Sequence, residues 1–200
     1  MRKLSVFEFI SLNGFFKGPG GDISWHKHGE EEGKYSEEAI QADHMLLFGR
    51  VTYEMMVGYW SSPMAAENSP VVAEGMNKAD KIVFSRTLEK VEWNNTKLMK
   101  NHIVEEIRKM KATPGKDMTI LGSGTIAALF ADAGLIDEIQ VMVDPVVIGS
   151  GTPLFHTIKT PLDLRLINTR TFKSGVVLLS YQLVNRSVAG IESYRITRIK

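Results

Sequence analysis

The sequence predicts a three-layer α/β domain, in which helices cover both faces of a central, mainly parallel sheet. Three observations support this fold class. Strand-like and helix-like segments alternate between residues 4 and 143, as expected when helical crossovers join parallel strands. Two strand-like segments then flank the turn Lys173-Ser174-Gly175, which is typical of an antiparallel hairpin. The length of 200 residues fits one domain.

The first half of the chain contributes alternating strands and helices. Residues 4–11 form a buried strand that ends before Asn13-Gly14. Residues 15–30 are glycine-rich and irregular, and a loop of this length in a compact domain is usually functional or disordered. Ser69-Pro70 is a good helix start, because Ser can cap and Pro is tolerated at the first position. Helices are expected over 31–44, 52–59 and 71–78, and strands over 45–48 and 81–85.

The second half adds the rest of the domain. Asn101 can cap a helix over 102–112, whose apolar residues share one face. A strand over 118–121, a helix over 125–133 and a strand over 137–143 follow. The hairpin then takes residues 162–172 and 176–183. The domain is therefore expected to span 1–183, and 184–200 to be a C-terminal extension, either an edge strand or a tail.

Composition excludes several classes of function. Lys and Arg number 24 against 23 Asp and Glu, so the net charge is +1. This balance argues against a nucleic-acid or anionic-membrane surface. The absence of cysteine excludes disulfides, Cys-ligated zinc, Fe–S clusters and thiol catalysis. No apolar run reaches the roughly 18 residues of a membrane helix. These features fit a cytoplasmic enzyme that acts on a small molecule.

A glycine-rich turn is the first candidate binding element. It comprises Gly122, Ser123, Gly124, Thr125 and Ile126, between a predicted strand and a predicted helix. Glycine lets the backbone approach a phosphate, and the N–H groups of a helix start favour negative charge. A purely structural turn is the alternative. A Rossmann-type NAD oxidoreductase, with Asp144 near the ribose, is a second interpretation, although that fingerprint normally opens the first βα unit.

Two further strand ends carry phosphate donors. At Gly49, Arg50 and Thr52, a guanidinium fork and a hydroxyl stand at a helix start. Ser85 and Arg86 follow the next strand and suit a phosphate monoester, such as the 2′-phosphate that separates NADP from NAD. Each could instead be a cap or a polar turn. Donors at three separate strand ends together indicate a dinucleotide phosphate site.

Six ordered motifs resemble the dihydrofolate reductase-like superfamily over about residues 2–183. They are S-L-N-G, G-D-I-S-W, G-R-V-T-Y-E, V-F-S-R-T-L, I-L-G-S-G-T-I and V-I-G-S-G-T-P-L-F. The resemblance is strongest to the branch that includes the C-terminal reductase domain of the bacterial bifunctional riboflavin-biosynthesis protein. It implies a mixed sheet of about eight strands, an NADPH site and, as in many relatives, a homodimer.

The resemblance also distributes roles along the chain. It implies that Gly49, Arg50 and Thr52 serve the cofactor phosphates, Ser85 and Arg86 the adenosine end, and residues 122–126 the pyrophosphate. The loop from Asn13 to Trp25 would cover the nicotinamide and the substrate. Asn13 stands where riboflavin-pathway reductases usually carry Asp. We expect Asn13 and the candidate proton donor Asp22 in the catalytic site, ordered water being the other proton source, and Trp25 and Tyr53 against the substrate.

Two groups of residues have no assigned role. Dihydrofolate reductases hold the pterin with a buried carboxylate on the first helix, and five acids compete for that position here: Glu31, Glu32, Glu37, Glu38 and Asp43. His26 and His28 form an H-x-H pair without an obvious third ligand, so no metal is expected.

The resulting hypothesis is an NADPH-dependent reductase. It would transfer hydride to a C=N or C=O carbon of a pteridine- or pyrimidine-type heterocycle or its ribosyl adduct, with residues 13–30 as a lid. A non-catalytic NADP(H)-binding module is an alternative class, which Asn13 favours. The Rossmann-type NAD oxidoreductase is the other.

Overall fold

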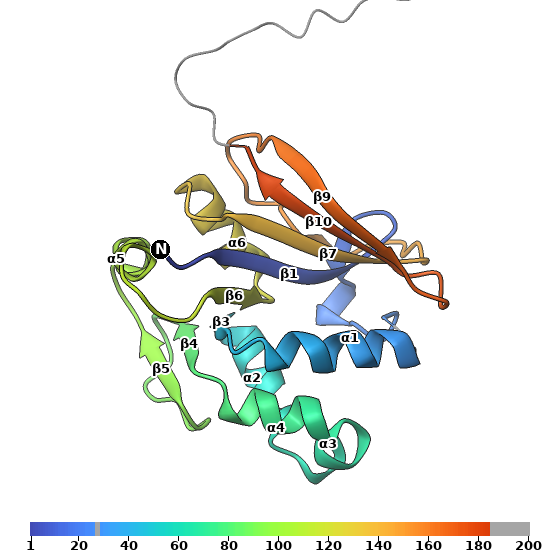
Figure 1. The fold of residues 1–200 in the computed structure, drawn as a ribbon, viewed down its shortest axis with the longest axis horizontal. Coiled ribbons are helices and arrows are strands. Elements are labelled where there is room, and N and C mark those ends of the chain that lie inside the picture. Colours follow the sequence, from blue (N-terminus) through green and yellow to red (C-terminus); the bar gives the residue numbers. More distant parts are fainter. Residues whose placement is uncertain (27–28, 185–200) are drawn as a thin grey trace, which may run out of the picture.

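The computed structural model describes residues 1–26 and 29–184, which form one large sheet with helices on both faces (Figure 1). The strands of this sheet are β1 (Leu4–Ser11), β3 (Met45–Gly49), β4 (Lys81–Phe84), β5 (Thr96–Met99), β6 (Met118–Leu121), β7 (Glu138–Asp144), β9 (Leu164–Thr171) and β10 (Val177–Leu183). Their order is β5-β4-β3-β6-β1-β7-β10-β9. The strands from β5 to β7 are parallel, and the hairpin of β9 and β10 adds an antiparallel edge. The predicted fold class is confirmed.

Two hydrophobic layers hold the helices against the sheet. The helices are α1 (Glu30–Gln41), α2 (Arg50–Trp60), α3 (Pro63–Asn68), α4 (Pro70–Lys78), α5 (Ile103–Ala112) and α6 (Gly124–Asp132). Ile107 of α5 and Ala127 of α6 pack on Leu47 of β3. Val72 and Met76 of α4 pack on the neighbouring β3 residues Leu46 and Phe48, which face the other way. Alternation along each strand therefore creates the three layers.

A small second sheet organises the glycine-rich loop, which the sequence analysis left irregular. β2 (Phe15–Lys17) pairs antiparallel with β8 (Thr152–Pro153), and a 3-10 turn, η1 (Pro19–Gly21), follows β2. Gly151 permits this pairing, because a methyl group there would lie 2.3 Å from the carbonyl oxygen of Lys17. The first part of the loop is thus attached to the segment after β7.

Other differences from the sequence prediction are local. β5 and α3 were not expected, since β5 is a short edge strand with half of its residues polar and α3 has only six residues. The prediction that Asn101 caps α5 is wrong. His102 precedes this helix in a left-handed conformation, φ +52°, and makes no side-chain cap bond.

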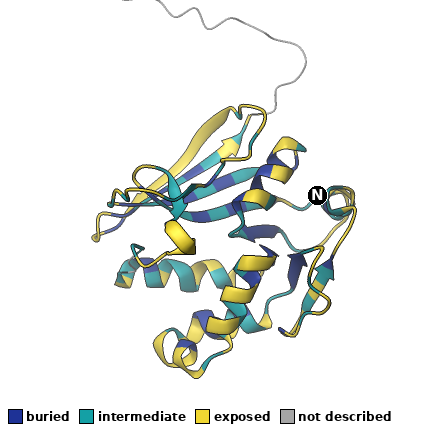
Figure 2. Cartoon of the chain, turned by 180° about the vertical axis from the view of Figure 1, so that it is seen from behind, coloured by how far each residue is buried: buried dark blue, intermediate teal, exposed yellow. Residues whose placement is uncertain are grey.

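The exposed surface is distributed unevenly over the sheet. All residues of β9 are exposed, and this edge strand is yellow throughout in Figure 2. The central strands are mostly buried. Within the described part of the chain, every helix is too short or too polar to cross a membrane. Of the expected C-terminal extension at 184–200, residues 185–200 lie outside the described residues.

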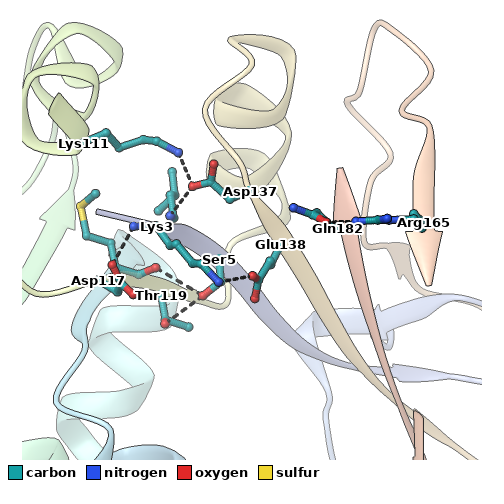
Figure 3. A network of polar contacts seen from close by, with 11 residues as sticks. Lys3, Ser5, Lys111, Asp117, Thr119, Asp137, Glu138, Arg165 and Gln182 are labelled. Atoms are coloured by element: carbon teal, nitrogen blue, oxygen red, sulfur yellow. Dashed lines mark hydrogen bonds and ion pairs between the residues drawn. The ribbon is translucent and has the colours of Figure 1, made fainter. Parts of the chain in front are cut away.

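The amino ends of the central strands are joined by a polar network (Figure 3). The Lys3 ammonium pairs with Glu138 at 2.6 Å, and the Lys3 N–H donates to Asp117 at 2.7 Å. Asp137 accepts the N–H of Leu4 at 2.7 Å and pairs with Lys111. This network fixes β1, β6 and β7 relative to one another at the end opposite the predicted site.

Candidate active site

The predicted phosphate-binding residues lie at the carboxyl ends of β4, β3 and β6, which are adjacent strands. Two of these strand ends touch. A methyl group on Gly49 would lie 2.5 Å from Ser123 Oγ, and one on Gly122 would lie 2.8 Å from Thr52 Cγ2. Gly122 also has a φ of +70°. Both positions therefore require glycine, and the sequence brings the two predicted turns into one surface.

The start of α6 presents unoccupied hydrogen-bond donors. Ser123 precedes the helix, and its Oγ accepts the N–H of Ile126 at 3.4 Å. Among the described residues, the N–H groups of Gly124 and Thr125 have no acceptor. Free N–H groups at the positive end of a helix dipole are a favourable environment for an anion.

Glu8 lies against the same turn, and the sequence analysis assigned it no role. Its β1 side chain is 7% exposed, and its Oε1 has no hydrogen-bond partner among the described residues. Burial raises the pKa of Glu8 to about 8, while hydrogen bonds from the N–H groups of Ser123 and Gly122 act in the opposite direction. Two of the backbone N–H groups that the sequence analysis assigned to phosphate thus bond to Glu8. The sequence signal for Glu8 was a carboxylate within a mostly apolar strand.

A cavity of about 640 Å³ opens beside these turns. Its polar lining includes Ser85, Arg86 and Thr125, all predicted, and Lys100 and His102, which the sequence analysis missed. Phe84, Met99 and Leu129 provide apolar walls. Ser85 Oγ accepts the N–H groups of Thr87 and Leu88 at 3.1 and 3.0 Å, so Ser85 also shapes the turn that carries Arg86. A cavity with apolar walls, three basic residues and one acidic residue, Glu105, in its lining suits a nucleotide.

Arg50 and Tyr53, at the start of α2, have other partners in this structure. Arg50 donates to both carboxylate oxygens of Glu54 at 2.9 and 3.2 Å, in an exposed pair. Tyr53 is buried, and its hydroxyl accepts the N–H groups of Glu92 and Trp93 at 3.0 and 3.3 Å. These contacts account for Tyr53 without a substrate, so its substrate role stays a prediction.

Asn13 connects β1 to the segment after β7. Its Nδ2 donates to the Ile148 carbonyl at 2.8 Å, and its Oδ1 accepts the Ile148 N–H at 3.3 Å and the Ser11 hydroxyl at 2.9 Å. A carboxylate could accept but not donate here. The structure therefore gives a local reason for Asn at this position.

Asp22 and Trp25 lie in the loop beyond η1. The exposed Asp22 carboxylate accepts the N–H of Ser24 at 2.9 Å, and bonding to Ser24 lowers the pKa of Asp22. The Trp25 indole N–H donates to the carbonyl of Asp22 at 3.2 Å. Both residues therefore stabilise the loop conformation, and their catalytic and substrate roles stay predictions.

His26 and Asp144 form a buried pair at the carboxyl end of β7. His26 Nδ1 lies 2.8 and 3.0 Å from the two Asp144 oxygens, and the side chains are 10% and 3% exposed. The His26 ring stacks on Phe9 of β1, with 3.9 Å between ring centroids. The Rossmann-type interpretation placed Asp144 near a ribose. In this structure Asp144 is instead bonded to His26. His28 lies outside the described residues, and no cluster of three metal-ligating side chains occurs among those described.

Glu32 is the buried acid among the five candidates of the first helix. It is 1% exposed and accepts a hydrogen bond from the Ser174 hydroxyl in the β9–β10 turn. Its neighbour Glu31 accepts the N–H of Lys173 at 2.9 Å. On the same face, Tyr35 of α1 packs near Phe7 and Phe172. The sequence could not select Glu32, because α1 begins with three consecutive acids and carries two more at Glu37 and Glu38.

Comparison with solved structures defines the class of fold. A protein from Shewanella sp. PV-4 assigned to riboflavin biosynthesis has a TM-score of 0.71 at 20% identity, covering 92% of this chain and 99% of that one. Dihydrofolate reductase from Enterococcus faecalis, complexed with NADP(H) and RAB-propyl, has a TM-score of 0.62 at 16% identity, with 92% and 97% coverage. The fold is therefore that of the dihydrofolate reductase-like proteins.

Sequence comparison places the chain more narrowly. Residues 2–178 match the model of the RibD C-terminal domain, and the chain belongs to this family. The uncharacterised protein YyaP of Bacillus subtilis is 32% identical over 180 residues, covering 90% of this chain and 94% of YyaP. YwjB of the same organism is 28% identical over 181 residues, with 88% and 96% coverage. The resemblance stated from the motifs is confirmed.

Proposed function

We propose that the protein is an NADPH-dependent reductase of a pteridine- or pyrimidine-type heterocycle or its ribosyl adduct. The observation that carries this proposal is that predicted phosphate donors after β4 and β6 line one cavity of about 640 Å³, while the turn after β3 touches the turn after β6. Membership of a family of reductase-like folds supports the reaction class. Named relatives support the substrate class, since a Thermotoga maritima protein with a TM-score of 0.67 is described as a deaminase and 5-amino-6-(5-phosphoribosylamino)uracil reductase.

The described residues fit the cofactor. The free N–H groups of Gly124 and Thr125 would hold the pyrophosphate, close to the contact between Gly49 and Ser123. Arg86, with Lys100 and His102 nearby, would bind the 2′-phosphate at the rim of the cavity. Arg50 would exchange Glu54 for a phosphate, because an exposed ion pair of this kind contributes little stability.

The protein's contribution to the reaction would be positioning and exclusion of water. The bound dihydronicotinamide supplies the hydride. Asn13 fixes the start of the loop over the strand ends, and Trp25 and His26 lie at the end of that loop. The rings of Phe7, Phe9 and Tyr35 pack together on the α1 face of β1, and a flat heterocycle bound at the end of β1 would extend this aromatic cluster. Asp22 would act from the exposed side of this loop.

A binding experiment tests the cofactor. NADPH and NADH are titrated against the purified protein by fluorescence, and we expect NADPH to bind several-fold more tightly. Arg86→Ala should remove most of this preference, because the variant loses a charged contact to the 2′-phosphate. Arg165→Ala, which alters an exposed arginine of β9, is the control. Equal affinity for both coenzymes would contradict the proposal.

A substrate panel tests the reaction. NADPH oxidation is followed with dihydrofolate, dihydrobiopterin and 5-amino-6-(5-phosphoribosylamino)uracil. Turnover of any one supports the reductase. Binding of NADPH without turnover would favour the non-catalytic NADP(H)-binding module instead. The contacts of Asn13 with Ile148 support that alternative, because they give Asn13 a structural role. The Rossmann-type alternative does not fit, because the strand order and the antiparallel hairpin belong to a different fold.

The predicted homodimer is a separate proposal. Leu164, Leu166 and Ile167 are exposed on β9, and a second copy could cover them. Light scattering of the purified protein should give twice the mass of one chain, and a monomer would contradict this expectation.

A further inference from the structure

The buried pair of His26 and Asp144 is the feature that the proposed function leaves unused. Nδ1 of His26 faces both Asp144 oxygens, at 2.8 and 3.0 Å. Because a carboxylate only accepts, this contact assigns a proton to Nδ1, which is directed at Asp144. A proton that this ring gives to a ligand would therefore come from Nε2. A carboxylate that fixes the orientation and tautomer of a histidine is the arrangement that acid–base catalysis uses.

Burial distinguishes this pair from the ion pairs of the surface. Both side chains are at least 90% buried, whereas the partners Lys34 and Glu30, for example, are 63% and 83% exposed. Removing two ionisable groups from water is costly, and an apolar contact would anchor a loop as well. An energetically expensive pair at the carboxyl ends of parallel strands is a candidate for function.

The position of the pair is on the substrate side of the proposed site. Asp144 is paired in register with Ser11 at the end of β1. The glycine turn after β6 flanks β1 on one side, and Asp144 of β7 flanks it on the other. The ring of His26 covers Phe9, on the face of β1 that α1 covers. A heterocycle bound at the end of β1 would thus lie between the phosphate donors and His26.

Other described ionisable groups near this end of the sheet are directed elsewhere. Glu8 lies against the turn after β6, and Asp22 is exposed and bonded to Ser24. Glu32 of α1 is bonded to Ser174. The Tyr35 hydroxyl faces Gln140 at 3.4 Å. Asp144 is therefore the acidic group that the structure places on His26.

We propose that His26 is the proton donor of the reduction and that Asp144 is its positioning residue. This inference rests on the proposed reductase. The carbon of the substrate C=N bond receives the hydride with its two electrons, from a dihydronicotinamide that is thereby oxidised. The π electrons of that bond move to nitrogen, which takes the proton from His26 Nε2. The neutral imidazole then regains a proton from water.

The test compares His26→Gln, Asp144→Asn and wild type, with His44→Gln as the matched control. His44 lies at the amino end of β3 and contacts Thr119, so its variant should keep full activity. With the substrate that the panel identifies, we expect both site variants to lose about 10²- to 10⁴-fold in turnover, the usual contribution of a general acid. Their affinity for NADPH, measured without substrate, should stay within about twofold of wild type.

The pH profile separates the two roles. Wild-type turnover should fall with rising pH, because a proton donor becomes less available as protons are removed. This fall should be absent in His26→Gln and retained, at a lower rate, in Asp144→Asn. Nitrogen-15 NMR of the substrate-free protein gives a readout without turnover: His26 should carry its proton on Nδ1 in wild type.

Four outcomes would overturn the inference. They are turnover of His26→Gln near the wild-type rate, an unchanged pH profile in that variant, an Nδ1 without a proton, and a loss of NADPH affinity that matches the loss of turnover. If NADPH binds and no substrate in the panel reacts, the reductase itself fails and this inference fails with it. If a substrate reacts and only the His26 results disagree, the reductase stands and the proton donor is another group, with Asp22→Asn the next variant.

Discussion

The two ends of the parallel strands use polar residues in opposite ways. At the amino ends, charged groups are paired with one another and with backbone N–H groups, as for Lys3, Asp117 and Asp137 (Figure 3). At the carboxyl ends, the N–H groups of Gly124 and Thr125 and the Oε1 of Glu8 have no partners among the described residues. The Nε of Arg2 is the exception at the amino ends.

This contrast separates stability from binding within one sheet. A buried polar group without a partner costs stability, and native proteins retain few of them. Such groups are expected where a ligand completes the hydrogen bonding. The amino ends should therefore respond to mutation through stability alone, and the carboxyl ends through ligand affinity as well.

The largest effect should come from Glu8→Gln, which tests the unsatisfied group directly. The pKa of Glu8 is raised from 4.5 to about 8 in the folded state. Its protonation therefore stabilises the fold fully below pH 4.5, and this contribution is lost as the pH rises through about 8. Between pH 5 and 9, the stability of the glutamine variant should gain a few kcal/mol relative to wild type.

Urea unfolding at both pH values measures this difference. Glu67→Gln, at an exposed carboxylate of α3, is the control and should show no relative gain. If the free energy of unfolding changes with pH in the same way in Glu8→Gln and in wild type, burial of the Glu8 carboxylate does not destabilise the fold.

Gly122→Ala should have the next largest effect. The substitution places a side chain at a φ of +70° and a methyl group 2.8 Å from Thr52 Cγ2. We expect a loss of about 1–3 kcal/mol of stability from backbone strain and a roughly tenfold weaker affinity for NADPH. Gly134→Ala is the matched control, because its φ is +66° and open space surrounds it. If both variants bind NADPH like wild type, the turn is only structural.

Asp137→Asn examines the opposite end of the strands. It removes the ion pair with Lys111 and weakens the bond from the N–H of Leu4. The free energy of unfolding should be about 1–2 kcal/mol lower than in wild type, the scale of a hydrogen bond to a charged group. NADPH affinity should not change, and a change would mean that the two ends are coupled.

The smallest effect is expected from Glu54→Ala. This variant frees the Arg50 guanidinium, whose pair with Glu54 is exposed. NADPH binding should tighten by about twofold, the scale of a surface ion pair. Weaker binding in the titration would indicate that Glu54 holds Arg50 in its binding position.

Much of this fold follows from the order of residues. The alternation of apolar and helix-like segments predicts β1, β3, β4, β6, β7 and the hairpin, because each of the parallel strands named here is a mostly apolar run. β5 escapes prediction because half of its residues are polar, and β2, β8 and α3 escape it because such short elements depend on contacts with distant residues. Asn101 satisfies the composition of a cap, but the chain turns at His102 instead.

Some features of the candidate site could likewise be predicted from the sequence, and others could not. Strand ends and glycines predict the turns at Gly49 and Gly122, because the geometry of parallel sheets collects them at one edge. The partners of charged side chains do not follow from sequence. Glu32 among five acids, Glu8 against a turn and His26 on Asp144 all depend on where the chain folds back.

The attachment of the glycine-rich loop limits how a substrate can enter. Asn13 and the β2–β8 pairing hold its beginning, and the contact of His26 with Asp144 holds its end. A hinged movement of the whole loop would break all three connections at once. Among the described residues of the loop, we expect any movement that admits a substrate in the span from Gly18 to Ser24, where three glycines widen the range of backbone conformations while both anchor points stay closed.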